Sequence, residues 1–185
     1  MKNVYHGSQI NDLKKLKKAK RTHNKEWVYA TPHKAIAVIF ICNKAGDLNY
    51  YLGSNGTKEE PIILVERKAN MFKNIFDISG SLYTLDARNF ISGKTGWSAE
   101  VISEHDEEVL KEEKIKNVFE KLIELDKNKE LILYLYPNRP DFIPLDNSDL
   151  IPKVIKWQKR GINIDSFFEL YPELKDKYTE ATKND

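Results

Sequence analysis

The amino-acid sequence predicts an α+β fold with helices gathered toward the C-terminal end. Three observations lead to this class. Short stretches typical of strands recur through residues 1–136, apolar side chains recur at helical spacing over residues 115–123, and an amphipathic pattern runs over residues 150–158. The chain has 185 residues, of which 41% are hydrophobic, so it is long enough for one compact core and too short for two large ones.

The first forty residues are expected to form two short strands and one buried helix. The strands end at residues 5–8 and 28–31. Residues 35–42 form an uninterrupted apolar run, and Thr31 and Pro32 before it fit a helix N-cap followed by proline at the first helical position. We therefore expect a helix there that is buried nearly all round.

Further strands are expected where apolar residues alternate with polar ones or form short runs: residues 48–52, 62–65, 81–85 and 100–104. In the last of these, Glu100, Ile102 and Glu104 would share one face of the strand. Two carboxylates on one face indicate that this face of the sheet is exposed to solvent, as in a cleft.

The second half of the chain is expected to become helical after one more strand. A helix over residues 115–123 and a strand over residues 131–136 lead to a loop rich in proline, and we place a domain boundary there, between residues 1–137 and 138–185. The C-terminal part is expected to hold a helix over residues 150–158 capped by Ser148 or Asp149, a short helix over residues 166–171, and a frayed polar end from Thr179.

Charge, cysteine content and apolar run length exclude several classes of protein. The 30 Lys and Arg against 28 Asp and Glu give a net charge of +2, which supplies no strong global field for nucleic acid or an anionic membrane. Cys42 is the single cysteine, so no intramolecular disulfide forms, and residues 35–42 are far shorter than a membrane span. The N-terminus lacks a signal peptide's apolar stretch. We expect a soluble cytoplasmic protein.

Three short segments carry the chemistry. His6-Gly7-Ser8 places a histidine beside a residue with no Cβ, Tyr29 ends a short strand immediately before the buried helix, and Glu100 leads a strand-like run. Each also has an ordinary structural interpretation: a histidine at a strand end, a core tyrosine and an exposed strand glutamate. The four histidines show no metal-ligand spacing, so no metal site is expected.

In this order, the three segments resemble the His-Tyr-Glu motifs of the diphtheria-toxin-like branch of the ADP-ribosyltransferase superfamily, to which the poly-ADP-ribose polymerases belong. The similarity covers residues 3–125. It implies split antiparallel β-sheets around a cleft for NAD, which is the substrate, with residues 1–137 as the catalytic domain and residues 138–185 as a helical extension. The implied activity is mono-ADP-ribosyl transfer, a glycosyltransferase reaction.

The resemblance also implies a role for each matching residue. His6 would hydrogen-bond a ribose hydroxyl of NAD, and the backbone of Gly7 would hold the nicotinamide carboxamide. Tyr29 would stack on the nicotinamide ring. Glu100 would bind the 2′-hydroxyl of the nicotinamide ribose and stabilise the cation that forms there. His6, Tyr29 and Glu100 are thus the expected catalytic residues. Ser8 and Thr31 belong to the same motifs and are expected to contact NAD.

Glu104 is the other candidate for the role of Glu100. Four residues along a strand place the two carboxylates roughly 13 Å apart, so both cannot act on one carbon. The same distance is too long for the paired carboxylates of a glycoside hydrolase. We assign the role to Glu100, because Val101 and Ile102 after it match the family's strand. Ser98 stands where arginine-modifying relatives carry Glu or Gln. That difference argues against arginine as acceptor and against polymer elongation.

Other acceptors and one other class of function stay open. The basic residues 14–21 lie between the first two motifs and would flank the cleft if the acceptor is a nucleic acid. A solvated lysine-rich loop is the alternative. A protein side chain other than arginine or a small molecule would also serve, and an antitoxin or regulatory partner would fit a toxin-like enzyme. The alternative function is a non-catalytic module that binds NAD, ADP-ribose or a partner.

Overall fold

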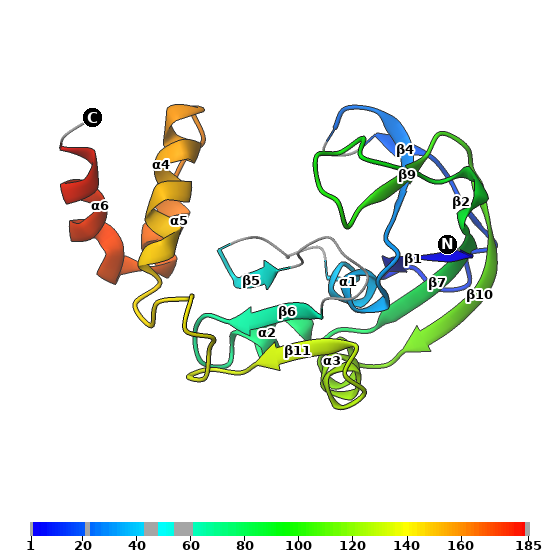
Figure 1. Cartoon of the computed structure of the whole chain (residues 1–185), viewed down its shortest axis with the longest axis horizontal. Helices are drawn as coiled ribbons and strands as arrows, with labels where there is room; N and C mark the ends of the chain where they lie inside the picture. The colour runs from blue at the N-terminus through cyan, green and yellow to red at the C-terminus, as the bar shows by residue number, and fades with distance from the viewer. Residues whose placement is uncertain (1, 21–22, 43–47, 54–60, 184–185) are drawn as a thin grey trace.

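The structure is a computed structural model of the whole chain and describes residues 2–20, 23–42, 48–53 and 61–183. It has the predicted α+β class, with β-sheets in the N-terminal part and three helices at the C-terminal end (Figure 1). In Figure 1 the sheets lie in the centre and on the right, and the C-terminal helices stand apart on the left.

One four-stranded antiparallel sheet is built on the longest strands of the chain. Its order is β1-β7-β10-β2. The strands are β1 (Asn3–Ser8), β7 (Gly80–Asp86), β10 (Glu107–Ile115) and β2 (Lys15–Leu16). Gly7 pairs with Leu82 in the register of β1 and β7, and the register of β7 and β10 shifts between Val109 and Lys111.

A second four-stranded antiparallel sheet of shorter strands closes the fold into a curled half-barrel. Its order is β3-β4-β9-β8. The strands are β3 (Ala19–Lys20), β4 (Glu26–Ala30), β9 (Val101–Ser103) and β8 (Ile91–Ser92). A core cluster that includes Val4, Val28, Leu85 and Val101 fills the space between this sheet and the first. Among the described residues, one isolated backbone bridge joins the two sheets: Tyr5 and Thr31 exchange hydrogen bonds of 2.8 and 2.9 Å. Beyond that bridge, the described residues of β1 and β4 form no further ladder pairs with each other.

The third sheet corrects the expectation that all the sheets are antiparallel. It has the order β11-β6-β5, with β5 (Tyr50–Gly53), β6 (Ile62–Glu66) and β11 (Leu131–Tyr134). β5 and β6 are antiparallel, but β6 and β11 are parallel. The connection from β6 to β11 runs through strands of the other two sheets and ends in the helix α3 (Val118–Lys127), a long crossover of the kind that parallel strands need.

The helix α1 (Lys34–Ile39) lies in the middle of the main core. Its residues 35–39 are all at most 2% exposed, which confirms the prediction of a helix buried nearly all round. It packs in one cluster with the helix α2 (Met71–Phe76) and with α3. Thr31 does not cap this helix as predicted. Its Oγ1 accepts the N–H of His33 at 3.2 Å and its backbone is tied to Tyr5, so that His33 becomes the N-cap.

The C-terminal helices form a separate apolar cluster within residues 150–178. They are α4 (Ile151–Lys159), α5 (Asp165–Leu170) and α6 (Lys175–Thr182), with short 3-10 turns at Ser148–Leu150 and Pro172–Leu174 and a third such turn at Ala87–Asn89. Ser148 and Asp149 therefore lie in a turn before α4 and do not cap it. The expected frayed end from Thr179 is wrong: Tyr178 is buried, and Thr182 donates to its carbonyl at 3.0 Å.

A buried arginine joins the C-terminal helices to β6. The side chain of Arg67, the residue after β6, is 3% exposed. It donates to both carboxylate oxygens of Asp149 at 3.0 and 2.8 Å and to Oδ1 of Asn147 at 3.2 Å. Arg139 donates to the same Asn147 oxygen at 3.0 Å and to the carbonyl of Arg67 at 3.1 Å. The hydroxyl of Tyr171 also donates to the carbonyl of Leu48.

Candidate functional site

A cavity of about 490 Å³ lies beside the bridge between Tyr5 and Thr31. Its walls come from β1 and the two residues after it, the end of β4, α1, and the turn that precedes β9. All six residues assigned from the motifs line this cavity: His6, Gly7, Ser8, Tyr29, Thr31 and Glu100. The fold therefore brings together three segments that are about 20 and 70 residues apart in the sequence.

His6 is oriented by the strand opposite. Its Nδ1 lies 2.7 Å from the carbonyl oxygen of Tyr29. A carbonyl only accepts hydrogen bonds, so Nδ1 carries the proton, and in the neutral ring Nε2 is then an acceptor. This arrangement suits a partner that donates, such as a sugar hydroxyl.

Gly7 is required by the packing of α1 on β1. A Cβ at this position would lie 1.8 Å from the carbonyl oxygen of Ala37 and 2.9 Å from a side-chain carbon of Ile41. The missing side chain therefore makes room for the helix, whereas the sequence suggested that it makes room for a ligand.

The backbone of Gly7 faces the cavity all the same. In a strand the N–H and C=O groups of residues two apart point to the same edge. Tyr5 uses these groups to pair with Thr31 on the β4 edge, so those of Gly7 point to that edge too. Within the described ranges β4 offers Gly7 no ladder partner there. An amide bound in the cavity would find one donor and one acceptor side by side.

Tyr29 belongs to a cluster of three rings. His23 stacks on it with ring centroids 6.1 Å apart and an interplanar angle of 24°. Trp27 meets Tyr29 edge-on at 6.0 Å. The sequence predicted Tyr29, but His23 lies between the recognised motifs and gave no signal of its own.

Glu100 does not lie within a strand, as predicted, but in the turn before β9. Its N–H donates to the carbonyl of Trp97 at 3.1 Å, which closes that turn, and β9 covers only Val101–Ser103. The strand ends because the hydroxyl of Ser103 accepts the N–H of His105 at 3.1 Å. Glu104 is exposed beyond β9 and does not line the cavity, whereas the Glu100 side chain is 23% exposed and does.

Two further aromatic residues line the same cavity and were not predicted. Phe40 follows α1 and is 46% exposed, and Trp97 meets it edge-on with centroids 5.8 Å apart. Phe40 lies inside the apolar run over residues 35–42, so its sequence context did not distinguish it from the buried residues of that helix. Together with Tyr29 these rings give the cavity flat apolar surfaces.

The loop after β1, which carries Gln9 and Ile10 of the cavity wall, is fixed by a polar network. One carboxylate oxygen of Glu112 accepts the N–H of Asp12 at 2.9 Å and the hydroxyl of Ser81 at 2.6 Å. The Ser81 hydroxyl is the main reason that the pKa of Glu112 lies below its ordinary value. Burial raises the pKa of the Tyr83 phenol, whose hydroxyl donates to the carbonyl of Ile10 at 2.7 Å.

The basic residues 14–20 are not a loop, because two short strands lie within them. β2 pairs with β10, and Lys15 forms a 3.0 Å ion pair with Glu108 that raises the pKa of the lysine. The N–H of Lys18 donates to Asp106 at 2.9 Å. Acidic residues thus lie against the basic ones and weaken their field. The prediction for Arg21 falls outside the described residues.

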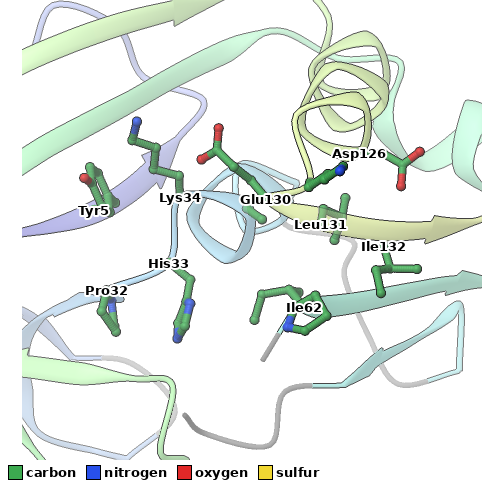
Figure 2. Close-up of a pocket in the computed structure, with 12 residues that line it drawn as sticks. Tyr5, Pro32, His33, Lys34, Ile62, Asp126, Glu130, Leu131 and Ile132 are labelled. Carbon is green, nitrogen blue, oxygen red and sulfur yellow. The ribbon is translucent and has the colours of Figure 1, made fainter. Parts of the chain in front are cut away.

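A second, larger cavity of about 710 Å³ is also lined by Tyr5 (Figure 2). Figure 2 shows side chains from the start of α1, from Ile62 of β6 and from the segment around β11 around it. Its lining mixes acidic and basic groups, Asp126 and Glu130 with Lys34 and Lys129. Tyr5 is the one residue that both cavities share, and none of the six assigned residues lines this one. It is therefore distinct from the candidate site.

No family model, curated protein or solved structure matches the chain. Any inference about its function therefore comes from the candidate site. Across the part of the chain that the structure describes, no group of three or more His, Cys, Asp or Glu side chains is placed to hold a metal ion. Within the same residues, no helix is both long and apolar enough to cross a membrane.

Proposed function

We propose that the protein is an NAD-dependent mono-ADP-ribosyltransferase, which cleaves the bond between nicotinamide and ribose and transfers ADP-ribose to an acceptor. One observation carries the proposal: six residues assigned from three separate motifs line a single cavity. Its volume of about 490 Å³ falls in the range typical of small-molecule sites.

The contacts expected of NAD match the groups around the cavity. The N–H and C=O of Gly7 on the open edge of β1 suit a carboxamide, which has one acceptor and two donors. The ring of Tyr29 offers a flat face to nicotinamide. Nε2 of His6 suits a ribose hydroxyl that donates, because its Nδ1 is committed to the Tyr29 carbonyl.

Glu100 supplies the charge that the reaction needs. As the bond from C1′ of the ribose to nicotinamide breaks, the electron pair leaves with nicotinamide and the ribose becomes an oxocarbenium-like cation. A carboxylate held beside that carbon stabilises the transition state more than the ground state. Preorganised groups of this kind contribute on the order of 100- to 1,000-fold in rate.

Ser98 stands where arginine-modifying members of the superfamily carry Glu or Gln, so the acceptor is expected to be a nucleic acid, a protein side chain other than arginine or a small molecule. The ion pair of Lys15 with Glu108 weakens the case for the basic residues as a nucleic-acid surface. A cytoplasmic location and an antitoxin or regulatory partner complete the proposal.

Release of nicotinamide from NAD tests the proposal whatever the acceptor. We expect Glu100→Gln to bind NAD with unchanged affinity and to release nicotinamide about 100-fold more slowly or worse, because only the transition state loses the charge. Glu104→Gln is the matched control: it makes the same chemical change at an exposed position outside the cavity. An active Glu100→Gln with an inactive Glu104→Gln would show that the wrong carboxylate is assigned. NAD binding without nicotinamide release would favour the alternative, a non-catalytic binding module.

A further inference from the structure

An imidazole lies beside the carboxylate of Glu100. The Nε2 atom of His23 is 3.9 Å from Oε2 of Glu100, and the two side chains are 34% and 23% exposed. The His23 ring stacks on Tyr29, and the Trp27 ring lies tilted beside it at a centroid distance of 6.2 Å. The imidazole is thus fixed between the aromatic cluster and Glu100, and it is open to solvent.

The distance between the two atoms is too long for a direct hydrogen bond and leaves room for a third group. An oxygen or nitrogen atom can lie about 2.8 Å from both atoms at once, which is ordinary hydrogen-bond geometry. An attacking atom in that place would be beside the carboxylate assigned to the reacting ribose carbon. A candidate general base must be within such reach of the proton that it removes.

We propose that His23 is a further catalytic residue, the general base that takes the proton from the acceptor as it attacks the ribose, and that the acceptor is a neutral hydroxyl or N–H group. The proposal rests on the proposed function. A carboxylate or phosphate acceptor carries no proton on its attacking oxygen and would need no base. The imidazole at this position therefore selects the class of acceptor.

The step balances without a further reactant. The bond from C1′ to the nicotinamide nitrogen breaks, and its electron pair neutralises the pyridinium so that nicotinamide leaves uncharged. The bond from C1′ to the acceptor atom forms from that atom's lone pair. The acceptor's proton passes to Nε2 of His23 and then to solvent.

Replacement of the base combined with an anionic nucleophile tests this role. In the full-length chain with NAD, water is the neutral nucleophile, and we expect His23→Gln to lower water-dependent nicotinamide release by about 100-fold, the lower end of general-base effects. Sodium azide attacks without losing a proton. It should therefore restore nicotinamide release in His23→Gln to within about 5-fold of the wild type, with ADP-ribosyl azide detected by mass spectrometry. His105→Gln, the same change at an exposed histidine beyond β9, should behave as the wild type.

The outcomes separate the inference from the proposed function. If the wild type releases nicotinamide and His23→Gln does so equally fast, the inference is wrong and the proposed function stands. The inference is also wrong if His23→Gln releases nicotinamide slowly and azide does not restore the rate. Loss of NAD binding in both His23→Gln and His23→Asn would overturn it too, because either result would make His23 a structural residue. No nicotinamide release from the wild type overturns the proposed function and the inference with it.

Discussion

Replacing Gly7 with alanine tests the closest approach between β1 and α1. The added Cβ would lie 1.8 Å from the carbonyl oxygen of Ala37, whereas real Cβ contacts essentially never fall under 3.0 Å. Strand and helix must therefore separate by about 1.2 Å or more. The closest obstacle is the backbone of Ala37 in the buried helix α1, which no side-chain rotation can move aside.

Overpacking of a core costs about 1–3 kcal/mol, and we expect Gly7→Ala to reach or exceed the upper value because the obstacle is backbone. For a chain of this size each kcal/mol lowers Tm by about 2–4 °C, so a fall of about 6–12 °C should appear in calorimetry. Gly93→Ala is the control: its φ of +75° costs an alanine about 1 kcal/mol, but nothing lies within 4 Å of the new Cβ. Equal falls in Tm for the two variants would refute the argument from close approach.

Substitutions at two other positions, Tyr29 and Tyr171, test separate parts of the structure. Tyr29→Ala should weaken NAD binding about 5- to 10-fold in calorimetric titration and Tyr29→Phe less than about 2-fold, because stacking needs the ring and not the hydroxyl; equal losses would assign the role to the hydroxyl. Burial raises the pKa of Tyr171 to about 12, so the folded protein keeps a proton that the unfolded chain loses near pH 10. The free energy of unfolding should therefore fall between about pH 10 and pH 12, and urea denaturation should show a smaller fall for Tyr171→Phe; an unchanged fall would mean that other groups cause it.

The parts of the fold that could be predicted are those that leave a local pattern. The apolar residues of α1 and the short strands around His6 and Tyr29 follow from spacing and composition alone. The parallel alignment of β6 and β11 leaves no such pattern, because it depends on where the chain returns after α3. The end of β9 was also hidden, because a single hydroxyl, that of Ser103, decides it.

The residues of the candidate site likewise include some that the sequence could indicate and some that it could not. The order of the three motifs along the chain led to the choice of Glu100, which lines the cavity with His6 and Tyr29. His23 and Phe40 could not be selected, because what distinguishes them is which side chain they approach across the fold: Glu100 for the first and Trp97 for the second. The function of Gly7 in packing likewise depends on a helix 30 residues away.

The pairing of Arg67 with Asp149 bears on whether the C-terminal helices are a detachable module. A fragment that ends at residue 137 would keep Arg67 and lose both of its side-chain partners, Asp149 and Asn147. Within the whole chain, losing these partners would leave a buried cation uncompensated, which costs about 3–5 kcal/mol, a large part of the 5–15 kcal/mol that stabilises a typical protein. The C-terminal segment is thus part of what keeps β6 folded, and the whole chain should melt in one cooperative transition. A different C-terminal segment could replace this one only if Arg67 were replaced as well.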